Sequence, residues 1–197
     1  MTPLKVTEAQ ALARRAGFHQ SCTDETGQLL AVLASSMRDA PILEIGSGFG
    51  VGTAWLASTA RVRVVTAESD PERARGVRAL MRDVPGVVVV HGDWAEALPH
   101  GPFGLIFVDA NMAKHDAVDT VIGAMIPGGL VLLDDLTPKE KWPAEWVGQP
   151  DALRDRWLTH PSLWAVEIRT GPDQCVIVAS KVDVQRPTPY AISQVDA

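Results

Sequence analysis

Acidic residues recur at regular places along this chain, each inside or just after a short apolar run. One lies within the first run, and the others follow or end four later runs: Glu44, Glu68, Asp93, Asp109, and the adjacent Asp134 and Asp135. Ligands of open α/β sheets bind at the carboxyl ends of the parallel strands. A single acid there usually caps the next helix, but five such strands in series indicate a shared site for a polar ligand.

The most informative spacing is in residues 41–56, where Glu44 is followed by glycines at 46, 48 and 50. This stretch predicts a buried strand (42–45), a glycine-rich turn (46–50) and a helix from about Val51. Glycine lets a ligand approach the backbone closely, and a helix N-terminus offers free N–H groups to a carboxylate or phosphate. The dinucleotide pattern G-x-G-x-x-G would place its last glycine at Val51 or Thr53. The spacing therefore disfavours a nicotinamide cofactor.

Around these acids, apolar runs alternate with amphipathic segments. Continuous apolar runs are typical of parallel strands covered on both faces, and the alternation predicts a doubly wound α/β sheet. We expect strands at 42–45, 62–67, 87–91, 105–108 and 130–133, helices at 71–83 and 113–125, and a short helical piece at 95–98. Two further helices, at 5–17 and 24–38, precede the first strand and are expected to cap the carboxyl edge of the sheet.

The end of the chain follows another pattern. A loop at 137–150 carries Trp142 and Trp146, and a helix is expected at 151–160. Two strands, 163–169 and 174–180, flank a hairpin-length turn. The sheet then has seven strands, the last pair antiparallel. The two tryptophans either form a wall for an aromatic acceptor or pin the loop to the body.

Composition limits the classes of function. The chain has 197 residues and a net charge of −6, which disfavours nucleic acid or an anionic membrane as a partner. Two cysteines form neither a disulfide framework nor a zinc motif, and no apolar run approaches about 18 residues. We expect one cytoplasmic domain: cap helices at 1–40, a core at 41–181 and a loose tail at 182–197.

Together these features resemble the class I S-adenosylmethionine-dependent methyltransferases. The similarity is to the small O-methyltransferase group that includes catechol and caffeoyl-coenzyme A O-methyltransferases. It covers about residues 20–181 and includes the segment Thr26-Gly-Gln-Leu-Leu before the first strand. The resemblance implies a Rossmann-like methyltransferase fold and methyl transfer to an oxygen of a small acceptor, with a catechol-like ring as one example.

The resemblance also assigns contacts with S-adenosylmethionine. Glu68, with Ser69 beside it, would bind the ribose hydroxyls, and Asp93 would accept the adenine amino group next to Trp94. Trp94 has packing in the core as an equal alternative, and Glu44 either contacts the cofactor or anchors the glycine turn. The remaining contacts would come from the glycine turn, the helix after it and the segment before the second helix: Gly46, Ser47, Gly48, Gly50, Thr53 and Cys22. Thr53 would supply a hydroxyl that the family often has as serine at the position of Gly52.

In cation-dependent members of the group, a metal is held by an aspartate after strand four and Asp-Asn after strand five. Asp109, Asp134 and Asp135 occupy these places, which implies a Mg²⁺ site in which Asp135 replaces asparagine; two adjacent carboxylates could equally cap a helix or loop. The family lysine three residues after the first aspartate is replaced by Met112. Lys114 is then the proposed catalytic base with Asp109 beside it, and His115 is a rival. The alternative for Lys114 is an exposed lysine at the start of a helix.

Two other functions are also compatible with the sequence. One is a nicotinamide-dependent oxidoreductase that uses the same glycine turn. The other is a module that binds S-adenosylmethionine without catalysis, which the departures at Met112 and Asp135 keep open. Family members often pair, so both a monomer and a homodimer are compatible with the sequence.

Overall fold

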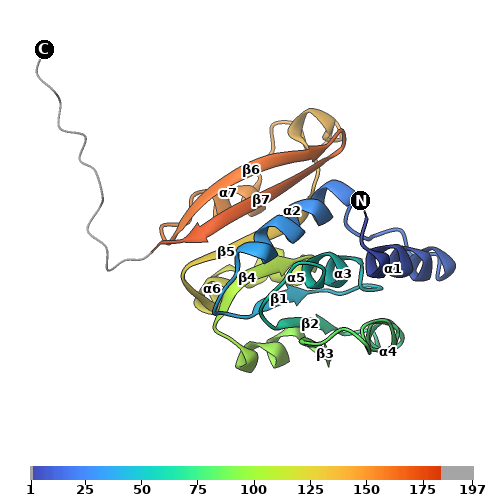
Figure 1. Cartoon of the computed structure of the whole chain (residues 1–197). Helices are drawn as coiled ribbons and strands as arrows, with labels where there is room; N and C mark the ends of the chain where they lie inside the picture. The colour runs from blue at the N-terminus through green and yellow to red at the C-terminus, as the bar shows by residue number, and fades with distance from the viewer. Residues whose placement is uncertain (1, 183–197) are drawn as a thin grey trace, which may run out of the picture.

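The computed structural model describes residues 2–182. Seven strands form one sheet in the order β3-β2-β1-β4-β5-β7-β6 (Figure 1). Neighbours among β1 to β5 are parallel, while β7 is antiparallel to both β5 and β6. The strands are β1 (Ile42–Ile45), β2 (Val64–Glu68), β3 (Val87–His91), β4 (Phe103–Val108), β5 (Met125–Leu136), β6 (Leu163–Gly171) and β7 (Gln174–Lys181). The predicted doubly wound sheet with an antiparallel last pair is confirmed.

Both faces of the sheet are covered, which explains the continuous apolar runs. Successive strand residues point to opposite faces, so Leu43 and Ile45 belong to one core cluster and Ile42 to the other. Helices α1, α2, α3 and α4 contribute to the cluster of Ile42, whereas α5, α6 and α7 contribute to the cluster of Leu43. The helices are α1 (Leu4–Arg15), α2 (Asp24–Ser36), α3 (Val51–Ala57), α4 (Pro71–Leu80), α5 (Asn111–Asp116), α6 (Val118–Gly123) and α7 (Ala152–Leu158), with the 3₁₀ helices η1 (Trp94–His100) and η2 (Lys139–Lys141).

Some predicted boundaries differ from the structure. The single helix expected at 113–125 is two helices, because Ala117 has φ −123° and ψ 23° and interrupts the helical backbone. Strand β5 is longer than the run 130–133 and includes both aspartates at its end. Of the tail expected at 182–197, residues 183–197 lie outside the described part of the chain.

Helix α2 lies beside α3 on one face of the sheet rather than over its edge (Figure 1). The packing is close: a Cβ on Gly27 would lie 2.1 Å from the indole nitrogen of Trp55 in α3. The segment between α1 and α2 approaches the carboxyl edge, where Phe18 reaches the glycine turn at Gly48. Among the described helices, none is long and apolar enough to cross a membrane.

The strand register brings the distant acids together. Ile45 pairs with Val108, and Val108 pairs with Leu133, so Asp109 and Asp134 follow matched positions on adjacent strands. The pairing of β5 with β7 shifts between Leu133 and Leu136, and Asp135 within this irregularity has φ 61°. Such a bulge redirects side chains at the end of a strand. Asp134 is consequently buried while the side chain of Asp135 is 50% exposed.

Candidate active site

A cavity of about 720 Å³ opens at the carboxyl edge of the sheet. It has the size of a site for a small organic ligand. Eight of the residues predicted from the sequence line it: Gly46, Gly48, Glu68, Ser69, Asp93, Trp94, Asp109 and Asp135. Four of the six acids named from the sequence therefore share one cavity, whereas Glu44 and Asp134 do not line it.

Glu68 connects the glycine turn to the end of β2. Its Oε2 accepts a hydrogen bond from the backbone N–H of Gly48 at 2.8 Å, and its Oε1 accepts one from the N–H of Asp70 at 2.9 Å. The Nε of Arg73 lies 3.7 Å from Oε1. Glu68 is thus held by fixed donors in the cavity wall, while Asp70 rather than Glu68 is the N-cap of α4.

Asp93 and Trp94 lie at the start of η1. Asp93 caps this helix by accepting from the N–H of Ala95 at 2.8 Å, and the carboxylate of Glu96 in turn accepts from the N–H of Asp93 at 3.1 Å. Trp94 lines the cavity and also packs against the core cluster of Leu43. Trp94 therefore has the predicted core packing and also a surface on the cavity, while its contact with adenine stays a prediction.

Glu44 and Thr53 form an internal network instead of lining the cavity. Glu44 is 1% exposed, and its Oε2 accepts hydrogen bonds from the hydroxyls of Thr53 and, at 2.6 Å, Thr66. Burial raises the pKa of Glu44 to about 7, against the opposing effect of these hydroxyls. The hydroxyl of Ser47 bonds to Thr66. Strand alternation directs Glu44 toward α3, which favours the second of its two predicted roles, that of an anchor beneath the glycine turn. The cofactor contacts predicted for Ser47 and Thr53 stay predictions, although the side chains of both residues belong to this internal network.

Gly52 explains one departure from the family pattern. A Cβ at this position would lie 2.2 Å from Oε1 of Glu44 and 2.8 Å from the ring of Phe107. Serine has no room there while Glu44 is in place.

Two other predicted residues are likewise absent from the cavity wall. A Cβ on Gly50 would lie 3.3 Å from the side chain of Val77, so this glycine permits the approach of α4. Cys22 is buried in the core, and burial with nearby carboxylates raises the pKa of its thiol well above the usual value. Neither residue lines the cavity, and the cofactor contacts predicted for Gly50 and for the backbone at Cys22 stay predictions.

Sequence reasoning missed Phe18 and Arg73, which both line the cavity. The ring of Phe18 packs edge-on against Phe49, with centroids 5.3 Å apart, and the guanidinium of Arg73 lies 5.5 Å from the centroid of Phe18. Phe18 lies in an irregular segment that carries no recognisable pattern. The only signal for Arg73 was its place one turn into the helix after Glu68.

Asp109, Asp134 and Asp135 form the acid cluster of the site. One carboxylate oxygen from each lies within 4.8 Å of the other two. Burial, followed by the charge of Asp135, raises the pKa of Asp109 to about 9, and burial raises the pKa of Asp134 to about 6. Since three close carboxylates cannot all carry charge without a cation, the cluster favours protonation or a bound metal.

Asp134 supplies the observation that points to a cation. Its Oδ1 accepts from Gln174 at 3.0 Å and from the hydroxyl of Thr26 at 3.4 Å. Its Oδ2 is buried and has no hydrogen-bond partner within the described residues. A buried polar atom without a partner is costly, and oxygen ligands are those that Mg²⁺ prefers. The residues therefore fit a small divalent cation.

Lys114 lies against the same cluster. Its side chain is 3% exposed, and its Nζ lies 3.4 Å from Oδ2 of Asp135 and 3.8 Å from Oδ1 of Asp109. It is therefore not the exposed lysine that a helix start would suggest, although it does not line the large cavity. His115 is exposed and does not line the cavity, whereas Met112 is on the cavity wall.

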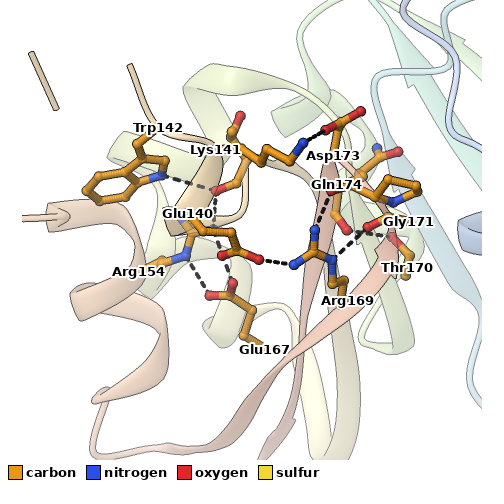
Figure 2. A network of polar contacts seen from close by, with 12 residues as sticks. Glu140, Lys141, Trp142, Arg154, Glu167, Arg169, Thr170, Gly171, Asp173 and Gln174 are labelled. Atoms are coloured by element: carbon orange, nitrogen blue, oxygen red, sulfur yellow. Dashed lines mark hydrogen bonds and ion pairs between the residues drawn. The ribbon is translucent and has the colours of Figure 1, made fainter. Parts of the chain in front are cut away.

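The loop after β5 is fixed by a buried arginine. Arg154, on α7, donates to the carbonyl of Thr137 at 2.8 Å and pairs with Glu167 at 2.5 Å (Figure 2). The indole of Trp142 donates to the same Thr137 carbonyl at 3.1 Å. Trp146 contacts Trp142 edge-on, with ring centroids 6.2 Å apart. Trp142 thus pins the loop, and neither tryptophan lines the large cavity.

Comparison with known proteins agrees with this geometry. Residues 43–136 match a family described as a methyltransferase domain. A catechol O-methyltransferase of Mycobacterium tuberculosis (strain ATCC 25618 / H37Rv) is 32% identical over 121 residues, or 57% of this chain. The match spans only about half, 55%, of that relative's length.

Solved structures resemble almost the whole chain. A cofactor-bound protein from MTB is 26% identical, covers 92% of each chain and has a TM-score of 0.76. An O-methyltransferase from Bacillus cereus in complex with SAH is 20% identical, covers 92% of each chain and has a TM-score of 0.75. The O-methyltransferase TomG from Streptomyces achromogenes, in complex with SAM, is 22% identical, covers 93% of this chain and 92% of its own, and has a TM-score of 0.75. The proteins from Bacillus cereus and Streptomyces achromogenes, at 20% and 22% identity, are similar to this chain in fold alone.

Proposed function

We propose that this chain, which belongs to the class I S-adenosylmethionine-dependent methyltransferases, transfers a methyl group to a hydroxyl oxygen of a small acceptor. Residues 1–197 would act as one domain. The observation that carries the proposal is the acid cluster with its unpartnered Asp134 oxygen, next to a cavity lined by the glycine turn and Glu68. The nicotinamide-dependent alternative has no comparable support, because neither the glycine spacing nor the family match favours it.

The wall of the large cavity would bind the methyl donor. Glu68 presents a carboxylate suited to a ribose diol, and the exposed Asp93 is placed to accept from an adenine amino group. Trp94 offers a flat apolar surface for the adenine ring. Arg73 and the backbone of Gly46 and Gly48 complete the wall. Such fixed contacts contribute to the rate because methyl transfer is an in-line displacement that depends on alignment.

The acceptor must also lose a proton. A phenolic hydroxyl has a pKa of about 10, so its oxyanion needs a nearby positive charge or a base at neutral pH. Asp109, Asp134 and Asp135 would hold Mg²⁺, and a divalent cation supplies Lewis-acid stabilisation of an oxyanion. Lys114, 3.4 Å from Asp135, adds a second positive charge beside the cluster and is our choice for the group that assists deprotonation.

The donor site is tested by calorimetric titration of S-adenosylhomocysteine into the wild-type protein and Glu68→Ala. We expect saturable binding that weakens at least tenfold in the variant, because two hydrogen-bonding oxygens are lost. A thermal-shift comparison with NADH should show stabilisation by S-adenosylhomocysteine alone. If S-adenosylhomocysteine does not bind, the proposed donor site is wrong and the proposed function with it.

The cation site is tested by titrating Mg²⁺ into protein saturated with S-adenosylhomocysteine. Asp134→Asn should abolish saturable binding, whereas Asp39→Asn, an exposed aspartate in the loop before β1, should leave it unchanged. Turnover of S-adenosylmethionine with any hydroxylated acceptor would exclude a module that only binds the cofactor. Equal Mg²⁺ affinity in the wild type and Asp134→Asn would refute the metal assignment.

A further inference from the structure

A second cavity, of about 520 Å³, adjoins the large one. His19, Gln20 and Asp135 line both cavities. The second cavity is bounded by the start of α2, by the end of β5 and by the β6–β7 turn at Gly171–Gln174. A ligand in it can therefore place one end beside the acid cluster while its other end extends toward α2 and the turn.

The acidic groups around this cavity do not all have a basic partner. Glu25, Asp135 and Asp173 line it, and none of the described lining residues is lysine or arginine. Two of the three acids have a basic partner, since Asp135 lies 3.4 Å from Nζ of Lys114 and Asp173 lies 3.2 Å from Nζ of Lys141. For Glu25, the described residues 2–182 provide no ion-pair partner.

The other basic group near the cavity is already engaged. Arg169 donates to the carbonyls of Gly171 and Pro172 and pairs with Glu140 (Figure 2). His19 is the one remaining side chain in the lining that can become positive.

The N-terminus of α2 does not favour an anion either. The hydroxyl of Thr23 already accepts from the N–H of Thr26 at 3.2 Å, and both acids of the first turn, Asp24 and Glu25, carry negative charge there. Acidic side chains are favourable at this end of the helix dipole. An anionic ligand would meet this charge without a free cation to offset it.

We propose that the second cavity holds the acceptor and that Glu25 selects acceptors whose far end is positively charged, such as an ammonium-bearing hydroxylated ring. Neutral acceptors are accommodated, whereas carboxylates, phosphates and acyl-coenzyme A thioesters are disfavoured. This inference rests on the proposed methyl transfer and adds the charge class of the substrate. Glu25 acts as a specificity-determining residue at the end of the acceptor remote from the reacting oxygen.

The test uses three catechols that differ in one substituent: dopamine, 4-ethylcatechol and 3,4-dihydroxyphenylacetate. For each, kcat/KM is measured with saturating S-adenosylmethionine, and the dissociation constant is measured with and without S-adenosylhomocysteine. We expect the ammonium compound to be preferred and the carboxylate to be the poorest ligand. Glu25→Gln should lower kcat/KM for dopamine about fivefold, the size of one partly exposed charge pair, and leave 4-ethylcatechol within about twofold.

Two more variants sharpen the comparison. Glu25→Lys should favour the carboxylate over the ammonium compound. Glu72→Gln is the matched control, because Glu72 is the second residue of α4 as Glu25 is of α2, but it lines neither cavity. This control should preserve the wild-type order of the three compounds.

The outcomes separate the inference from the function on which it rests. Methylation of all three catechols with no change of preference in Glu25→Gln would overturn the inference and leave the methyltransferase proposal intact. Binding that follows the expected order without methylation would refute the proposed reaction on catechols but support the charge selection. If none of the three compounds binds, the assignment of the cavity is wrong.

Discussion

Replacing Glu44 by glutamine should change how the stability of the protein depends on pH. Glu44 is 1% exposed, and burial raises its pKa from 4.5 to about 7. The folded state therefore binds this proton more tightly than the unfolded state, so the free energy of unfolding falls as pH rises from about 4.5 to about 7. One pKa unit corresponds to about 1.4 kcal/mol, so the contribution is about 3 kcal/mol, most of which is lost between pH 5 and pH 8.

Urea unfolding of the wild type and Glu44→Gln at pH 5 and pH 8 measures this difference. The buried Asp109 and Asp134 titrate in both proteins, so the difference between the two pH dependences isolates Glu44. We expect the wild type to lose about 2–3 kcal/mol more than the variant over this range. The affinity for S-adenosylhomocysteine at pH 8 should stay within about twofold, because Glu44 does not line the cavity and a twofold change is under about 0.5 kcal/mol. Parallel pH dependences would refute the buried titration, and a tenfold loss of affinity would show that the carboxylate reaches the ligand.

Three further substitutions test the geometry of the site. Asp135→Asn should lower the pKa of Asp109 from about 9, because the charge of Asp135 is the second cause of that shift after burial; carboxyl ¹³C NMR titration measures it, and an unchanged pKa would contradict the coupling. Gly52→Ala should cost about 1–3 kcal/mol in urea unfolding, since its Cβ would overlap Oε1 of Glu44; in a double-mutant cycle Glu44→Ala should reduce that cost, and full additivity would exclude the clash as its cause. Arg154→Met should cost about 3–5 kcal/mol by leaving Asp151 and Glu167 without their partner, whereas the exposed Arg38→Met should cost under about 0.5 kcal/mol; equal losses would refute the role of Arg154 in fixing the loop.

Much of the fold could be predicted because the strands are short apolar runs and the acids follow them at constant places. Because neighbouring strands are parallel, the acids at their carboxyl ends gather at one edge of the sheet. For this reason the sequence alone predicted that Glu68, Asp93 and Asp109 lie near one another. The structure also shows two N-caps that the sequence analysis did not use. Thr23 caps α2 and Asp70 caps α4, each through a hydrogen bond from a backbone N–H to its side chain.

What could not be predicted depends on the direction of individual side chains. Glu44 lies inside β1, where alternation decides whether the carboxylate faces a helix or the cavity, and Gly52 leaves the space that accepts it. Phe18 reaches the glycine turn from an irregular segment, so no periodicity indicates its contact. The sequence likewise gives no signal for the break in the helix at Ala117, because alanine is a good helix former and tertiary context can override that preference.

The two departures from the family pattern around the acid cluster explain each other. The expected lysine is missing at Met112, which is 73% exposed on the cavity rim, and asparagine is replaced by Asp135. In the structure the extra carboxylate lies 3.4 Å from Nζ of Lys114, two residues beyond the expected position. Burying a lysine without a partner would be expensive, and a third carboxylate in the cluster would be unfavourable without a positive charge. Lys114 and Asp135 therefore each supply the opposite charge that the other requires. The site keeps a positive charge beside its acids, carried on α5 by Lys114 instead of by a lysine at position 112.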